Sequence, residues 1–209
     1  MKTIFSFLLI LLCISGYSQK SKKPAKNAGK VTVLAKAENL TAALIDHKGS
    51  HAFYLLNSKA GKTDSLLIKA IVNKSASDLP AEGKIMPFSA KGNKLYLVTW
   101  KEKSTTGDAK SRLEITTETH SQIWDLDLKA SVFSNVQKVI NISEIVFLDP
   151  NKNASKTVEK VRRDGFELTL EPVGDIILKN KTQQDKLAYD AASRKYVAVK
   201  SALAAPKKK

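Results

Sequence analysis

Two pairs of aromatic and acidic residues carry the most suggestive chemistry in this sequence. Trp100 lies two residues before Glu102, and Trp124 directly precedes Asp125. Sugar and small-ligand sites combine flat aromatic rings with a few polar groups that form hydrogen bonds. These four residues are therefore the candidate ligand-binding residues. Both rings also alternate in phase with apolar neighbours along their strands, so packing into a core is the alternative explanation.

The histidines are weaker candidates for a metal-binding or catalytic role. His47 and His51 flank a short Lys-Gly-Ser segment, but zinc takes three or four ligands and no cysteine or third histidine lies near them. His120 directly precedes Ser121, and neighbouring residues of a strand point to opposite faces, so the pair cannot form the hydrogen bond that activates a nucleophile. We therefore expect no metal and no cofactor.

Paired carboxylates are the remaining route to catalysis. Asp125 and Asp127 would share one strand face about 7 Å apart, and glycoside hydrolysis uses two carboxyl groups roughly 5–10 Å apart across a cleft. The same alternation arises in any strand that turns a polar side to water. The sequence contains neither a G-x-S-x-G motif nor a phosphate-binding glycine loop. We expect a protein that is not an enzyme and has no catalytic residue, with a hydrolase acting on glycan or ester as the alternative.

The elements that position these residues follow a period of two. Apolar and polar residues alternate over 94–100 and again over 112–117, and the segment 104–111 between them has the composition of a loop. This pattern predicts a hairpin. Two more hairpins are expected over 166–178 and 186–199. Further strands are expected over 31–34, 51–56, 65–72, 121–128 and 140–148.

One short helix is expected over 154–163. Val158 and Val161 lie three residues apart, Glu159 and Arg163 lie four apart, and Gly165 stands where a helix would end. The segment 39–47 fits either a short helix or a strand. Together these elements predict an all-β fold. We expect a single antiparallel β-sandwich or barrel of about nine to eleven strands, in one domain over 31–200.

The N-terminus has the pattern of a secretory signal peptide. A basic start precedes an apolar run over 4–14, and small residues follow it, which predicts cleavage between Ser18 and Gln19. The run is shorter than the roughly 20 apolar residues of a membrane span, so no transmembrane anchor is expected after processing. Cys13 follows two leucines rather than small residues and would be removed with the signal over 1–18. Basic, disordered tails are expected over 19–30 and 201–209.

The net charge of +15 is concentrated in these ends, because ten of the 35 basic residues and none of the 20 acidic residues lie outside 31–199. Lysine outnumbers arginine by 31 to 4, which disfavours specific nucleic-acid binding, since arginine makes the bidentate contacts to bases and phosphates. The expected partners are anionic envelope components, namely lipid head groups, lipopolysaccharide or acidic glycan.

Several segments carry a resemblance to known proteins. CISGYSQ with the lysine-rich stretch after it, NKLYLVTWKE, SEIVFLDPNKNAS and VGDIILKNK resemble secreted β-rich proteins of Bacteroidetes-type bacteria that have no assigned function. The resemblance implies export and transfers no functional residue. The C-terminal AAPKKK is unlike a cell-surface sorting domain, which favours the periplasm over the extracellular side. We expect an exported, envelope-associated binding or structural module that contacts glycan, lipid or an anionic surface.

Overall fold

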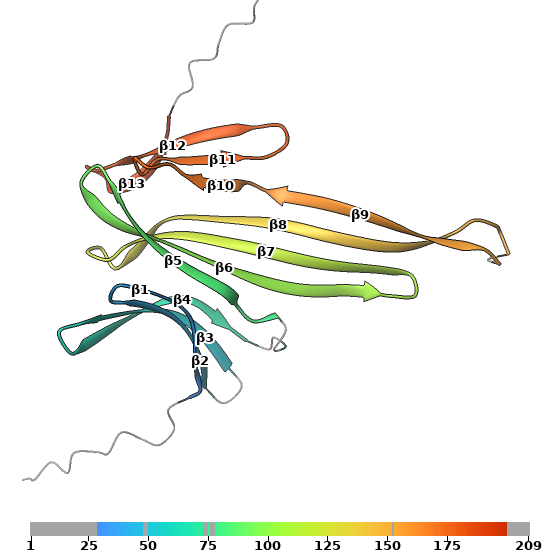
Figure 1. Cartoon of the computed structure of the whole chain (residues 1–209), viewed down its shortest axis with the longest axis horizontal. Helices are drawn as coiled ribbons and strands as arrows, with labels where there is room; N and C mark the ends of the chain where they lie inside the picture. Colours follow the sequence, from blue (N-terminus) through green and yellow to red (C-terminus); the bar gives the residue numbers. More distant parts are fainter. Residues whose placement is uncertain (1–28, 48–49, 73–74, 76–77, 152, 200–209) are drawn as a thin grey trace, which may run out of the picture.

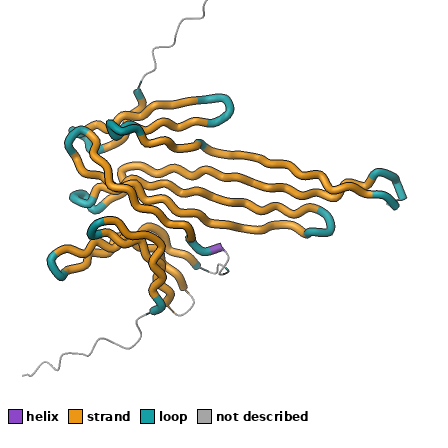
Figure 2. Tube along the Cα trace, viewed as in Figure 1, coloured by secondary structure: helices purple, strands orange, loops and turns teal. Residues whose placement is uncertain are grey.

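The computed structural model describes residues 29–47, 50–72, 75, 78–151 and 153–199, and within them the chain is built from strands (Figures 1 and 2). The expected signal peptide with its Ser18–Gln19 cleavage site, most of the N-terminal tail and the tail over 201–209 lie outside these residues. Thirteen strands form three antiparallel sheets within the described residues.

Consecutive strands pair in every sheet, so each sheet is a meander. Sheet A contains β1 (Val31–Ala37), β2 (Leu40–His47), β3 (Ser50–Lys59) and β4 (Lys62–Ile71). Sheet B contains β5 (Ala81–Ala90), β6 (Asn93–Asp108), β7 (Arg112–Asp125), β8 (Ala130–Phe147) and β9 (Ser155–Gly165). Sheet C contains β10 (Glu167–Leu170), β11 (Ile176–Lys179), β12 (Gln184–Asp190) and β13 (Lys195–Ala198).

Sheet B is the middle layer at one end of the molecule (Figure 1). One of its faces packs against sheet A, through a core that includes Phe53, Val98 and Trp100. The opposite face packs against sheet C, through a core that includes Leu97 and Tyr189. The alternating side chains of β6 therefore supply both cores, because neighbouring residues of a strand point to opposite faces.

The longer strands of sheet B continue beyond sheets A and C as a single layer (Figure 1). We call this region the sheet B extension; it comprises 103–108 of β6, 112–119 of β7, 137–147 of β8 and 155–165 of β9. Its A-side face continues the face that packs on sheet A. Its C-side face continues the face that packs on sheet C. The regular register across the four strands fixes the face on which each residue lies.

The all-β, antiparallel class is confirmed, but three finer expectations are wrong. A closed barrel is excluded because each sheet is open, with two edge strands in the described residues. The expected helix over 154–163 is a segment of strand β9, which pairs with β8 from Gly165 to Ser155. The expected loop over 104–111 is mostly strand, since β6 runs to Asp108. A single sandwich of nine to eleven strands is not confirmed, since thirteen described strands form three sheets.

The helix expectation failed because tertiary context overrode local spacing. The outer edge of β8 offers a long row of backbone hydrogen-bonding groups, and pairing them with β9 satisfies both strands. Thr157, Val158 and Val161 are β-branched, which favours a strand over a helix. The ambiguous segment 39–47 is likewise a strand, β2, whose central residues Ala42, Ala43 and Leu44 are buried.

Candidate functional site

The four candidate ligand-binding residues are all buried. Trp100 is 1% exposed, Glu102 3%, Trp124 6% and Asp125 0%. Both tryptophans pack in the core between sheets A and B, where Phe53 meets the Trp100 ring edge-on with centroids 5.1 Å apart. Their contact with a ligand stays a prediction, but a ligand could reach the rings only if sheets A and B separated.

Glu102 lies at the point where sheet A ends and the extension begins. Its carboxylate accepts two hydrogen bonds from the Lys69 ammonium of β4, at 2.8 and 2.9 Å, and a third from the Trp100 indole at 3.0 Å. The imidazole Nε2 of His120 lies 3.6 Å from the same carboxylate. Register places His120 directly opposite Trp100, and their rings stack with centroids 4.8 Å apart and planes 3° from parallel. Glu102 and His120, which lie on separate segments of the sequence, are therefore joined by the fold.

This cluster continues across the sheet toward solvent. Glu118 lies 3.3 Å from His120 Nε2 and 2.7 Å from the Lys138 ammonium on β8. The hydrogen bond from Lys138 lowers the pKa of Glu118. Burial lowers the pKa of His120, although the two carboxylates oppose that shift. A neutral imidazole between two carboxylates could exchange a proton, but Ser121 lies on the opposite face of β7 from His120, as the sequence predicts.

Asp125 stabilises a different region of the fold. Its carboxylate accepts the backbone N–H groups of Asp127 and Leu128 at 3.0 and 3.2 Å, which holds the β7–β8 turn. It also lies 3.0 Å from the guanidinium of Arg194, in the turn between β12 and β13. Asp125 thus joins sheet B to sheet C, on the opposite face from the Glu102 cluster. Glu102, His120 and Asp125 do not meet in one cleft.

Neither metal ligation nor a membrane-spanning helix is supported by the described residues. They contain no group of three His, Cys, Asp or Glu side chains placed to hold a metal ion. Among the same residues there is no helix long and apolar enough to cross a membrane.

The His51 side chain lines an apolar pocket of about 560 Å³ on sheet A, together with Ile45, Tyr54 and Ile71.

The sheet B extension presents two faces of different chemistry. On the A-side face, charged side chains pair with one another: Arg112 lies 2.7 Å from Glu114, and Lys160 lies 3.3 Å from Glu144. On the C-side face, one cross-strand row is wholly uncharged. It contains Thr105, Ile115, Asn141 and Val161, all of which are exposed.

A polar pocket of about 250 Å³ lies where the C-side face meets sheet C. We call it the corner pocket; its lining residues are Gln137, Arg163, Gly165, Glu167, Lys179, Asn180 and Lys181. Sequence reasoning missed it because β8, β9 and the turn after β11 meet only in the folded chain. The one signal available was the pair of lysines, 179 and 181, in the segment VGDIILKNK.

Comparison with known proteins assigns no family. No family model matches the chain, and neither a curated protein nor a solved structure matches it.

Proposed function

We propose that this chain is an exported, envelope-associated binding module that holds an extended glycan along the C-side face of the sheet B extension. The observation that carries the proposal is the difference between the two faces of one single-layer sheet. Most charged side chains of the A-side face form ion pairs with one another, whereas the C-side face exposes hydroxyl, amide and aliphatic groups together with Lys103, Glu159 and Arg163. Export rests on the signal-like first 18 residues, and envelope association on the lysine-rich ends.

The composition of the C-side face suits a sugar polymer. Glycans present hydroxyl groups around the ring edge and C–H groups on the ring faces. Thr105, Thr117 and Asn141 provide donors and acceptors for the hydroxyls. Ile115, 40% exposed, and Val161, 54% exposed, provide apolar contacts for the ring faces. The two apolar side chains lie in one cross-strand row with the Asn141 amide between them, so one sugar chain lying across the strands can contact all three.

The shape of the surface favours a polymer over a small molecule. Small ligands bind in concave sites that bury most of their surface. The C-side face is instead a strip four strands wide that ends at the corner pocket. An extended chain can make many weak contacts along such a strip, and the basic protein attracts acidic polymers over longer distances.

The test is binding of the purified chain to immobilised alginate, polygalacturonate, dextran and peptidoglycan. Thr117 and Thr116 are adjacent, both half-buried, and on opposite faces. Thr117→Glu adds a bulky charge to the C-side face and should weaken binding to the preferred polymer about fivefold or more. Thr116→Glu makes the same charge change on the A-side face and should leave binding unchanged. Equal effects of the two substitutions, or no polymer bound at all, would overturn the proposal.

The alternative function, hydrolysis of glycan or ester, is favoured by the position of His120 between Glu102 and Glu118. A histidine beside carboxylates is a common acid–base arrangement. Turnover of chromogenic glycosides and esters would support it if His120→Gln abolished the activity while the Thr117→Glu variant retained it. Absence of turnover by the folded wild-type chain would remove this alternative.

A further inference from the structure

We infer that the corner pocket binds the carboxylate of a hexuronic acid residue, so that the glycan held on the C-side face is an acidic one. The inference rests on the proposed function for the polymer itself. The pocket, however, can be tested with a monosaccharide.

The walls of the pocket are held by hydrogen bonds between side chains and backbone groups. The Asn180 side chain accepts the N–H groups of Thr182 and Gln183 at 2.9 and 2.8 Å, which holds the turn between β11 and β12. Across the pocket, the Asn135 amide donates to the Phe166 carbonyl at 2.8 Å and holds the β9–β10 junction. A pocket whose walls are held before binding loses little conformational entropy when it binds a ligand.

Gly165 lines the pocket at the end of β9, where the strand lies close to the β8 backbone. Its φ of +79° lies in the left-handed region, and a Cβ atom there would lie 2.4 Å from the Val136 carbonyl oxygen. Only glycine therefore lets β9 approach β8 so closely at the end of the strand. The Gln137 side chain, directly opposite Gly165 in the register, lines the pocket beside it.

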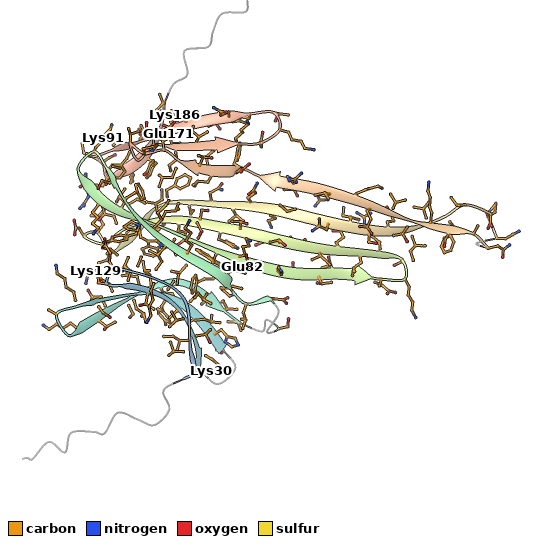
Figure 3. All side chains as sticks on the ribbon, viewed as in Figure 1. Lys30, Glu82, Lys91, Lys129, Glu171 and Lys186 are labelled. Carbon is orange, nitrogen blue, oxygen red and sulfur yellow. The ribbon has the colours of Figure 1, made fainter. Side chains whose placement is uncertain are left out.

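The pocket carries an excess of unpaired positive charge. Among the described residues, Arg163, Lys179 and Lys181 form no ion pair, and only Glu167 brings a carboxylate to the lining. Basic groups nearby behave differently: Arg162 lies 3.1 Å from Asp164, and Lys186 lies 2.7 Å from Glu171, a pair labelled in Figure 3. Three cations facing one concavity without carboxylate partners repel one another, and a bound anion would relieve that repulsion.

The donor set suits a sugar acid better than a simple anion. Arginine offers a planar fork that matches a carboxylate, and the two lysines can approach the same oxygens. The amides of Gln137 and Asn180 are suited to hydroxyl groups. A volume of about 250 Å³ is just below the range of roughly 300–1,000 Å³ of drug-sized ligand pockets, which indicates a single sugar unit. Arg163 also ends the C-side row that contains Thr117 and Val139, so the pocket continues the proposed glycan strip.

The experiment is an NMR titration of the ¹⁵N-labelled chain with sodium galacturonate, glucose and inorganic phosphate. Galacturonate should shift the amide signals of Gly165, Lys179 and Lys181. Glucose should not shift them, and phosphate should bind more weakly. Arg163→Gln should weaken galacturonate binding about tenfold, the loss expected for a charge-assisted hydrogen bond. The matched variant Arg162→Gln, one residue away on the A-side face, should bind as the wild type does. Glu167→Gln should strengthen binding, since it removes the one carboxylate of the pocket.

Three results would overturn the inference: no shift with galacturonate, equal weakening in the two arginine variants, or phosphate bound more tightly than galacturonate. These results would leave the polymer strip standing if Thr117→Glu still weakened polysaccharide binding. Conversely, galacturonate bound at the pocket together with no polymer bound would contradict the proposed function alone.

Discussion

Lys69 of sheet A and Glu102 of sheet B form a two-hydrogen-bond ion pair that joins the two layers at the base of the extension. The carboxylate is 3% exposed, whereas the lysine is 33% exposed. The two partners therefore differ in how well water can replace the interaction. Because of this difference in exposure, removing the lysine and removing the carboxylate should have different effects on the stability of the contact between sheets A and B.

Substituting Lys69 should destabilise the fold more than substituting Glu102. Lys69→Met removes the ammonium that donates two hydrogen bonds to a buried carboxylate and should cost about 3 kcal/mol of unfolding free energy. Glu102→Gln should cost about 1–2 kcal/mol, because the freed lysine can turn to solvent. Urea denaturation followed by tryptophan fluorescence measures both. The control is Lys129→Met, since Lys129 and Asp64 form an exposed pair worth less than about 1 kcal/mol. A loss from Lys69→Met no larger than that of the control would contradict the prediction.

His120 should make the fold sensitive to mild acid. Burial lowers the pKa of His120 below its ordinary value of 6.5. At pH values between the lowered pKa and 6.5, the unfolded chain therefore binds more protons than the folded chain. The free energy of unfolding is therefore highest above pH 6.5, where His120 is neutral in both states, and it declines as the pH falls toward the lowered pKa. Burial and the charges of Glu102, Lys69 and Glu118 around the ring set the size of the shift.

Denaturation midpoints measured between about pH 5 and 8 test this dependence. His120→Gln should flatten the slope. The lowered pKa of Glu118 acts below its ordinary value of 4.5 and so lies outside this window. An unchanged slope in the variant would assign the pH dependence to another group.

Gly165→Ala should destabilise the chain more than Gly61→Ala. Both glycines have a φ in the left-handed region, so both substitutions carry a backbone cost of about 1–2 kcal/mol. Only at position 165 would the new Cβ atom also collide, with the Val136 carbonyl, since nothing lies within 4 Å at position 61. The two variants share the backbone cost, so the difference between their melting temperatures reports the cost of the collision. Equal losses would mean that β9 can move away from β8 at no cost.

The buried Asp125 should matter far more than its exposed neighbour Asp127. Both lie within 3.3 Å of the Arg194 guanidinium, but the Asp127 side chain is 85% exposed. Asp125→Ala removes two turn hydrogen bonds and leaves Arg194 without its buried partner, so it should cost about 3 kcal/mol. Asp127→Ala should cost less than about 1 kcal/mol. Hydrogen exchange of β12 and β13 would show whether sheet C loosens first, which would be the signature of a lost link between layers.

The local alternation of apolar and polar residues predicts many of the strands. It does not predict how the strands divide into three packed sheets. The hairpins at β6–β7, β10–β11 and β12–β13 followed from period-two patterns and turn residues. Strand β5 was missed because Pro87 interrupts its pattern, although β5 is an edge strand, where proline is tolerated. The division into three sheets depends on contacts between distant segments, which no local pattern encodes.

The candidate site shows the same limit. The alternation of Trp100 with apolar neighbours already indicated that the ring could be buried. Nothing in the sequence placed Lys69 beside Glu102, or Arg163 beside Lys179, because each pair joins different sheets or distant strands. Charged residues that look alike in the sequence, such as Arg162 and Arg163, acquire different surroundings only when β9 pairs with β8.

The central claim is that one face of the sheet B extension binds glycan. Methyl-labelled threonine NMR reads the two faces directly, because Thr105, Thr117 and Thr119 lie on the C-side face while Thr106 and Thr116 lie on the A-side face. Polygalacturonate added to the purified chain should shift the methyl signals of the first three and leave the other two unchanged. Shifts on the A-side threonines, or none on any of the five, would contradict the claim.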